Sequence, residues 1–187
     1  MHGSSQEGIG SLVAREDCIL VIIDVQDKLM PVIADKEKVI SNVARLVQFC
    51  RITGIPVVVT EQQKLGGTVS EVRGELPVEG AIQKVHFNCF SCEDFAERVK
   101  KIGKKILVLT GVEAHICVAQ TALHALSSYD VQVISDAVSS RTADNRSIAL
   151  LRMRDAGATI TSTEMFIYEI LQKAGTDEFR AVLPFVK

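Results

Sequence analysis

Three polar residues of this chain have side chains that together can carry out nucleophilic catalysis. Asp24 follows the apolar run 18–23, Lys84 lies in the run 81–87, and Cys117 follows the run 106–109. A cysteine thiolate can attack a carbonyl-type carbon and form a covalent intermediate. An aspartate can take the thiol proton, pass it to the leaving group and then activate water. A lysine ammonium can hold both anions in place.

Each of the three residues also has a purely structural explanation. Free cysteines are usually small buried apolar residues, so Cys117 alone is weak evidence for a nucleophile. Asp24 could be a turn residue at a strand end, and Lys84 could be an exposed lysine on an edge strand. The catalytic hypothesis therefore depends on whether the fold brings the three side chains together.

The elements that must position them follow from the hydrophobic pattern. Short apolar runs predict strands at 18–23, 57–59, 81–87, 106–109, 131–134 and 158–161. Three- and four-residue spacing predicts helices at 35–51, 91–102, 118–129, 142–156 and 164–174, with Ser91 capping the second and Asp94 completing a capping box. Residues 64–80 are expected to form a loop. The alternation predicts an α/β fold, a three-layer α/β/α arrangement with a Rossmann-like, six-stranded, mainly parallel sheet.

This fold would bring the three side chains to one place. If the sheet is wound outward from its first strand, the carboxyl ends of the strands meet at the crevice where open α/β sheets bind ligands. Cys117 is expected where a strand passes into a helix. The free N–H groups and the dipole at that helix start favour a thiolate, as does the nearby ammonium of Lys84, so we expect a low pKa for Cys117.

Composition limits the class of protein. The 187 residues fit a single domain, 1–187, that begins with a polar segment at 1–15. A net charge of −2 without a basic block argues against nucleic acid or a membrane as partner. The 47% apolar content lies in strand-length runs, which favours a buried sheet and leaves apolar surface for a subunit interface. Five unevenly spaced cysteines and the lack of an apolar leader indicate a cytoplasmic protein with reduced thiols.

Four linked segments resemble the isochorismatase-like (cysteine hydrolase) superfamily over roughly residues 18–171. They are 22–27 (IIDVQD), 84–90 (KVHFNCF), 110–118 (TGVEAHICV) and 135–141 (SDAVSSR). The resemblance implies that Asp24, Lys84 and Cys117 are the catalytic triad. It also implies a non-proline cis peptide at Val112–Glu113 and an oxyanion hole formed by the backbone amides of Glu113 and Cys117. The sequence of 113–117 looks most like that of the isochorismatase domain-containing hydrolases. Because dimers and larger assemblies are common in the superfamily, the resemblance and the apolar content together imply a homo-oligomer.

Two departures from relatives narrow the expected activity. Nicotinamidases of this superfamily bind a metal through Asp-x-His after the second strand, whereas residues 60–64 (TEQQK) contain no histidine, so we expect neither a metal nor another cofactor. True isochorismatases lack the catalytic cysteine that this chain has. We therefore expect a hydrolase of a small molecule with an amide, imide or carbamoyl-type C–N bond. The candidate pocket residues are Gln26, Glu61, Gln62, Phe87 and His115.

Other motifs leave alternatives open. Cys89 and Cys92 form a C-x-x-C pair, which can be redox-active or half of a zinc site, but no second pair is present and structural packing is the favoured interpretation. His115 is either a pocket residue or a turn residue, and Asp136 with Arg141 is interpreted as a structural loop clamp. Besides the cysteine hydrolase, the hypotheses are a thiol-redox protein using Cys89 and Cys92 and a catalytically silent assembly module.

Overall fold

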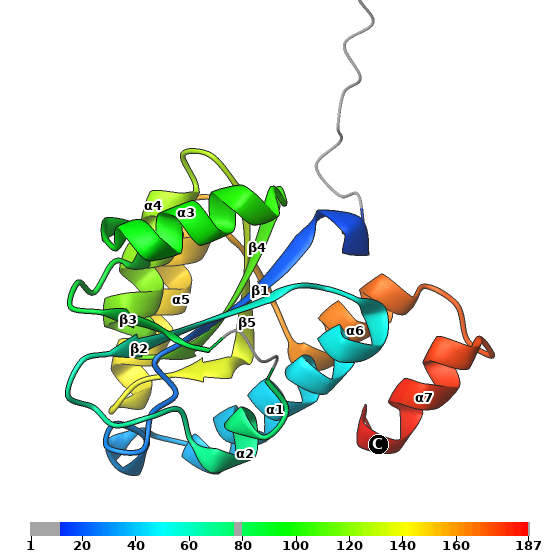
Figure 1. Cartoon of the computed structure of the whole chain (residues 1–187), viewed down its shortest axis with the longest axis horizontal. Helices are drawn as coiled ribbons and strands as arrows, with labels where there is room; N and C mark the ends of the chain where they lie inside the picture. The colour runs from blue at the N-terminus through cyan, green and yellow to red at the C-terminus, as the bar shows by residue number, and fades with distance from the viewer. Residues whose placement is uncertain (1–11, 77–79, 187) are drawn as a thin grey trace, which may run out of the picture.

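The computed structural model describes residues 12–76 and 80–186. Most of the polar segment 1–15 and part of the expected loop 64–80 lie outside these residues. Six parallel strands form one sheet in the order β3-β2-β1-β4-β5-β6, between two layers of helices (Figure 1). The predicted three-layer α/β/α fold is confirmed.

The strands are β1 Cys18–Ile23, β2 Val57–Gln62, β3 Ile82–Lys84, β4 Ile106–Val112, β5 Asp130–Ser139 and β6 Thr159–Thr161. The helices are α1 Lys36–Thr53, α2 Ser70–Arg73, α3 Glu93–Ile102, α4 Ala119–Ala125, α5 Ala143–Asp155, α6 Thr163–Leu171 and α7 Asp177–Val186. Two glycines in the left-handed region, Gly54 and Gly103, directly follow α1 and α3 and end these helices.

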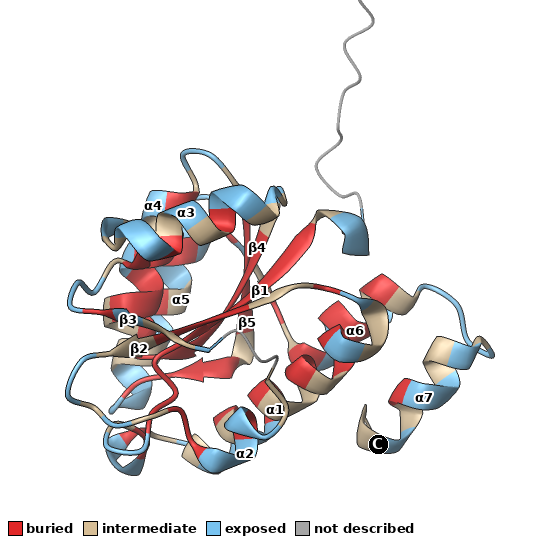
Figure 2. Ribbon diagram, in the orientation of Figure 1, coloured by how far each residue is buried: buried red, intermediate tan, exposed pale blue. Residues whose placement is uncertain are grey.

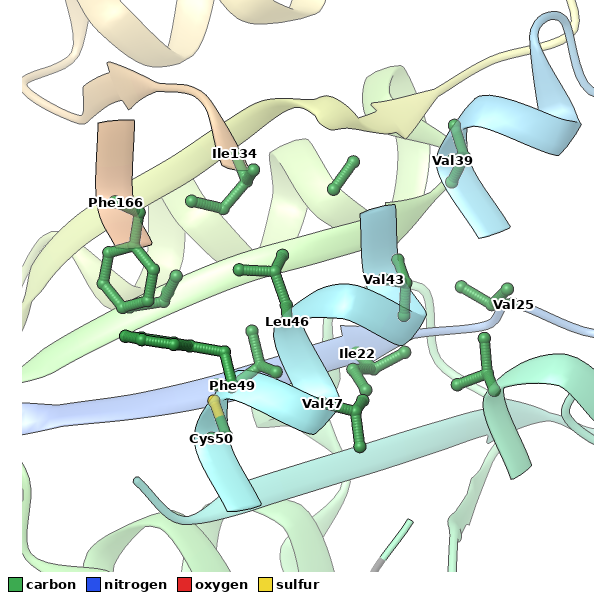
Figure 3. Close-up of a cluster of buried hydrophobic side chains, with 14 of the residues drawn as sticks. Ile22, Val25, Val39, Val43, Leu46, Val47, Phe49, Cys50, Ile134 and Phe166 are labelled. Carbon is green, nitrogen blue, oxygen red and sulfur yellow. The ribbon is translucent and has the colours of Figure 1, made fainter. Parts of the chain in front are cut away.

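The central strand β1 is buried on both faces, which explains its unbroken apolar sequence (Figure 2). Leu20 and Ile22 belong to the core beneath α1, α6 and α7. The alternate residues of the strand, at 19, 21 and 23, belong to the core beneath α3, α4 and α5. In the first core, the rings of Phe49 on α1 and Phe166 on α6 meet edge to face with centroids 6.1 Å apart (Figure 3).

The sheet is wound outward from β1, as is needed for the three side chains to meet at one edge. β1 pairs with β2 on one side and β4 on the other, so Ile23 lies level with both Thr60 and Gly111. The edge strand β3 then pairs with β2 so that Lys84 lies level with Gln62. The carboxyl ends of four strands therefore open at one edge of the sheet, on both sides of the switch point at β1.

Some predicted elements were wrong in extent. β5 continues to Ser139 instead of ending at 134, because its pairing with β4 resumes after a register shift between Leu109 and Gly111. Ser91 does not cap α3; it lies in a 3₁₀ turn, and the cap residue Cys92 has no side-chain capping bond. The short helix α2 lies in the expected loop, and β3 covers only 82–84 of the predicted run 81–87.

Helix α7 was not predicted at all. Pro184 lies inside it, and proline usually interrupts helices, so the sequence pattern does not favour a helix there. Val182 is nevertheless fully buried and joins the core under α1. Tertiary packing thus stabilises a segment whose local sequence is unfavourable. No helix in the described part of the chain is both long and apolar enough to cross a membrane.

Gly111 of β4 lies directly against Ile23 of β1. Its φ is +103°, and a Cβ atom there would lie 2.0 Å from the carbonyl oxygen of Ile23. We expect Gly111→Ala to lower the free energy of unfolding by more than about 2 kcal/mol, since the β1 backbone must move and the φ is unfavourable for alanine. Urea unfolding measures this loss. Gly54→Ala is the matched control, because its φ is +73° but no atom lies within 4 Å of the added Cβ; equal losses in the two variants would contradict the steric explanation.

Candidate active site

Asp24 begins the turn that follows β1, and its backbone conformation suits its position. Its φ of +54° lies in the left-handed region, which aspartate tolerates better than most residues. The carboxylate is fully buried: Thr60 Oγ1 donates to Oδ1 at 2.9 Å, and Lys84 Nζ donates to Oδ2 at 2.6 Å. The turn therefore fixes a buried carboxylate above the middle of the sheet.

Lys84 is buried although it lies on the edge strand β3, with only 2% of its surface exposed. Its ammonium reaches across the end of β2 and donates to Asp24, to Gln62 Oε1 at 2.8 Å and to Cys117 Sγ at 3.8 Å. An isolated ammonium would be costly to bury, so this environment is built around its charge. The alternative of an exposed edge-strand lysine is excluded.

Cys117 lies in the π-helical turn Ala114–Val118, which connects β4 to α4. The α-helix begins at Ala119 and not directly after Cys117 as expected. Single π-helical turns occur often at functional sites. The thiol is 6% exposed and adjoins both Lys84 and Asp24. The structure thus brings together the three predicted side chains, from the ends of β1, β3 and β4.

The electrostatics of the site differ from the prediction of a low thiol pKa. Burial raises the pKa of Cys117 above its usual value, the Asp24 carboxylate raises it further, and the Lys84 ammonium opposes both. The expected low-pKa thiolate is therefore wrong, because the adjoining carboxylate and the buried setting outweigh the single cation. Cys117 needs a neighbouring base to become a thiolate.

Asp24 is placed to be that base. Burial raises the pKa of its carboxyl, against the effect of Lys84 and of the hydrogen bonds it accepts. Burial alone would lower the pKa of Lys84, but the charges of Asp24 and Cys117 raise it, so the lysine stays cationic. A carboxyl with a raised pKa is a better proton acceptor for a thiol than an ordinary one, since the two pKa values lie closer together.

The turn before Cys117 contains the expected cis peptide. The bond between Val112 and Glu113 is cis, and Glu113 is buried. Glu113 Oε2 accepts hydrogen bonds from Arg141 N at 3.0 Å and Arg141 Nε at 3.1 Å. The predicted clamp between Asp136 and Arg141 is therefore wrong: Asp136 Oδ1 accepts from the backbone and hydroxyl of Thr163 instead, both at 2.8 Å.

The five candidate pocket residues have different surroundings. Gln26 is fully buried and bonded to the backbone of Gln62. Glu61 accepts hydrogen bonds from Thr68 and Gln83, which lower the pKa of its carboxyl against a desolvation effect that raises it. The side chain of Gln62 contacts Lys84.

The remaining two candidates are Phe87 and His115. Phe87 is half exposed, and no hydrogen bond or ring contact places it against the triad. His115 Nδ1 lies 2.9 Å from Ser140 Oγ, so the histidine has a partner in the loop after β5. The sequence hypothesis that His115 is a turn residue and the hypothesis that it is a pocket residue are both compatible with this contact.

Two residues that contact the triad or its partners were not predicted. Thr60 bonds directly to Asp24, and its position could have been found from the register that sets it level with Ile23. Cys89 is fully buried, with its sulfur 4.0 Å from Thr60 Oγ1, and burial raises the pKa of its thiol to about 11. Cys92, the other member of the C-x-x-C pair, is half-buried and lies 3.7 Å from the carbonyl oxygen of Gln83. All five cysteines are free.

Among residues 12–76 and 80–186, no group of three His, Cys, Asp or Glu side chains is arranged to hold a metal ion. At the position where nicotinamidases carry metal ligands, Glu61 is engaged by Thr68 and Gln83. The site as it stands is an acid, an ammonium and a thiol in one buried cluster.

Comparisons with known proteins identify the family of this chain. The isochorismatase domain model matches residues 18–165. The secreted isochorismatase effector Isc1 of Phytophthora sojae is 36% identical, over 98% of this chain and 90% of its own. Isochorismatase domain-containing protein 2 of Danio rerio is also 36% identical, over 94% of this chain and 89% of its own.

Solved structures share the fold over nearly the whole chain. The structure described as MAR1 ribonuclease from Caenorhabditis elegans matches with a TM-score of 0.87 and 30% identity, over 94% of this chain and 92% of that one. The YCAC gene product of Escherichia coli, described as an octameric hydrolase of unknown specificity, matches with a TM-score of 0.89 and 26% identity, over 95% and 90% of the two chains. The family model and the curated relatives each cover most of the sequence, and this chain therefore belongs to the isochorismatase family.

Proposed function

We propose that this protein is a hydrolase that cleaves an amide, imide or carbamoyl-type C–N bond of a small molecule, with Cys117 as nucleophile. The observation that carries the proposal is the buried ammonium of Lys84, which lies 2.6 Å from Asp24 Oδ2 and 3.8 Å from Cys117 Sγ. Burying these charged groups in the protein interior costs desolvation free energy. Groups with perturbed pKa values are concentrated at functional sites. The hydrolase described from Escherichia coli, which shares the fold, supports the same class of reaction.

The first half of the reaction forms a thioester. Asp24 removes the proton from Cys117 as the sulfur attacks the carbonyl carbon, and the π electrons of the carbonyl move to its oxygen. When the C–O double bond reforms, the C–N bond breaks and Asp24 gives its proton to the leaving nitrogen. The amine departs and the acyl group stays on sulfur. Lys84 remains protonated and stabilises the carboxylate and the developing thiolate.

The second half releases the acid and restores the enzyme. A water molecule attacks the thioester carbon while Asp24 takes one of its protons, and that proton returns to the sulfur when the C–S bond breaks. In both halves the carbonyl oxygen carries negative charge. We propose that the backbone amides of Glu113 and Cys117 stabilise it, since the turn after β4 supplies both next to the thiol. We propose that the reaction requires neither a metal nor another cofactor.

A further relative supports a reactive centre in this fold. A structure of YcaC from Pseudomonas aeruginosa, with a TM-score of 0.87 and 26% identity, is described as containing covalent acrylamide. Acrylamide is an electrophile, and thiolates are the side chains best suited to attack electrophiles at neutral pH. This is the behaviour proposed here for Cys117.

The test is a screen of amides, imides, ureas and N-carbamoyl compounds for hydrolysis, with and without a chelator. We expect Cys117→Ser to lower turnover of any substrate found by at least about 10³-fold, because a hydroxyl is a far weaker nucleophile in a site built for sulfur. Cys92→Ser, which removes the half-buried thiol outside the triad, should retain full activity. Hydrolysis that survives in Cys117→Ser would refute the proposal, and loss of activity with the chelator would refute its metal-free form.

The other two hypotheses make different predictions. A thiol-redox protein would form a reversible disulfide between Cys89 and Cys92 and would be indifferent to loss of Asp24. An assembly module would keep its function when Cys117 is replaced. The buried ion pair between Lys84 and Asp24 favours the enzyme over both, because neither alternative has a use for it.

We also propose that the chain forms a single domain, acts in the cytoplasm and assembles as a homo-oligomer. The five free thiols support a reducing compartment. The octamer described from Escherichia coli supports assembly, as do exposed apolar residues such as Ile148, Leu151 and Met165. Light scattering at micromolar concentration should give a multiple of the 20.4 kDa chain mass, and a monomer would contradict the proposal.

A further inference from the structure

We propose that Gln62 is a positioning residue for the nucleophile and acts by fixing the ammonium of Lys84. This inference rests on the proposed cysteine hydrolase. An ammonium has three N–H donors, and the structure provides three acceptors for that of Lys84: Asp24 Oδ2 at 2.6 Å, Gln62 Oε1 at 2.8 Å and Cys117 Sγ at 3.8 Å. All three donors are thus used inside the protein, and Lys84 has none left for a substrate.

The amide of Gln62 is held in one orientation. Its Nε2 donates to the carbonyl oxygen of Val85 at 2.8 Å, while its Oε1 accepts from Lys84. A flipped amide would face its NH₂ group toward the ammonium and its oxygen toward the carbonyl, so both contacts would become repulsive. The oxygen of Gln62 is therefore committed to Lys84.

The backbone of Gln62 is fixed as firmly as its side chain. Gln62 N donates to Gln26 Oε1 at 2.8 Å, and Gln26 Nε2 donates to the carbonyl oxygens of Gln62 at 3.0 Å and Gly66 at 2.7 Å. β1 ends at Ile23, whereas β2 continues to Gln62. The buried side-chain amide of Gln26 therefore bonds to the backbone N–H and C=O of Gln62, as a neighbouring strand would. On its other side, Gln62 pairs with Lys84 of β3.

Gln62 therefore acts by holding the ammonium of Lys84 in position, and not by contacting the substrate. With the oxygen of Gln62 in place, the ammonium cannot turn away from the triad, and Asp24 and Cys117 keep their relative positions. Without it, one N–H of a buried ammonium has no partner, which is costly and is relieved by rotation or by water entering the site.

The test compares Gln62→Met with Gln63→Met, both in a Cys92→Ser background. Methionine keeps the length of glutamine but has no amide. Gln63 is the exposed neighbour, and its hydrogen bond to Lys84 is made by its backbone N–H, which the substitution leaves in place. The probe is iodoacetamide, and labelling of Cys117 is followed by peptide mapping. We expect Gln62→Met to label Cys117 about tenfold more slowly at neutral pH, the loss expected for one hydrogen bond to a charged group.

A second measurement separates positioning from a general loss of structure. The lysine ammonium signals in a ¹H–¹⁵N correlation spectrum report hydrogen bonding of Nζ, and a Lys84→Met sample assigns the signal of Lys84. That signal should persist in Gln63→Met and in Gln62→Glu, whose carboxylate keeps an acceptor for the ammonium, and should broaden or vanish in Gln62→Met. Wild-type labelling with an unchanged Lys84 signal in Gln62→Met, or loss of the signal in Gln62→Glu, would overturn the role of Gln62. Neither result affects the proposed hydrolase, which is tested separately by Cys117→Ser.

Discussion

Replacement of Asp24 by asparagine is expected to lower turnover by about 10²- to 10⁴-fold at neutral pH, the usual contribution of a positioned general base. The amide oxygen can still accept a hydrogen bond from Thr60, but the side chain can neither take the proton of Cys117 nor deliver it to the leaving nitrogen. Steady-state assays on a substrate from the screen measure the loss. Asp27→Asn is the matched control, since Asp27 belongs to the same sequence motif but is exposed and faces Arg73 at 3.7 Å.

The same variant should change how thiol reactivity depends on pH. In the wild type, Asp24 and Cys117 share one proton over the range between their two coupled titrations, so the thiolate fraction, and the iodoacetamide rate, should be nearly flat there. In Asp24→Asn the thiol must lose its proton to water, and the rate should rise about tenfold per pH unit below the thiol pKa. Identical profiles in the two proteins, or turnover within tenfold of the wild type, would exclude Asp24 as the base.

As the pH falls, the wild type should lose activity at a higher pH than it would if its catalytic base had the pKa of an ordinary aspartate. Asp24 accepts a proton only as a carboxylate, and burial raises its pKa above the usual value of about 3.9. The acid limb of the kcat/KM profile should therefore lie above that value. This limb belongs to the coupled pair of Asp24 and Cys117 and not to either group alone.

The fold could be predicted from the sequence because local pattern and tertiary structure agree in the central strands. β1 and the first part of β4 are buried on both faces, so their apolar runs stand out clearly between polar residues. β5 was predicted too short because the polar pair at 135–136 falls where the ladder is interrupted, and a register shift cannot be read from composition. Helix α7 was not predicted because its proline is unfavourable in a helix. Packing against α1, which local sequence does not reveal, stabilises the helix nevertheless.

The triad could be placed because each member lies at a strand end, and strand ends converge in this topology. What the sequence could not give is the direction of each side chain. Lys84 was as compatible with an exposed edge as with a buried site, and only its register opposite Gln62 shows that it reaches over β2. The low thiol pKa was predicted from the helix start and the lysine alone. It failed because the approach of the Asp24 carboxylate and the depth of burial are properties of the assembled fold.

Replacement of Lys84 by methionine is expected to remove activity and to destabilise the fold, and the two effects can be separated. Turnover should fall by about 10²-fold or more, because Asp24 and Cys117 then face each other without a cation and the thiol pKa rises further. Iodoacetamide labelling of Cys117 should slow accordingly. Lys84→Arg should not restore either property, since the planar guanidinium does not fit a fully buried site shaped for a compact ammonium.

The loss of stability comes from Asp24 and should therefore depend on pH. Breaking a buried ion pair by removing one partner costs about 3–5 kcal/mol, because the remaining charge is uncompensated. In Lys84→Met the carboxyl escapes this cost by keeping its proton, so its folded pKa, which burial already holds above the unfolded value of about 3.9 in the wild type, rises further. Between these two pKa values the folded state binds more protons than the unfolded state, and the unfolding free energy should fall by up to about 1.4 kcal/mol for each unit of rising pH.

Removing the carboxylate as well should reverse most of this loss without restoring the enzyme. The double variant Asp24→Asn/Lys84→Met has no buried charge in the pair, and neutral groups of similar shape are often tolerated in place of a buried ion pair. Urea unfolding at pH 5 and pH 8 tests the pattern, with Lys105→Met as a surface control because that lysine is exposed and lies 4.0 Å from Asp17. We expect the single variant to lose much more stability at pH 8 than at pH 5, and the double variant to be more stable than the single at pH 8 yet inactive. A single variant as stable as the control at pH 8 would show that Lys84 and Asp24 are not a coupled buried pair, and the proposed chemistry would lose its base and its counter-charge together.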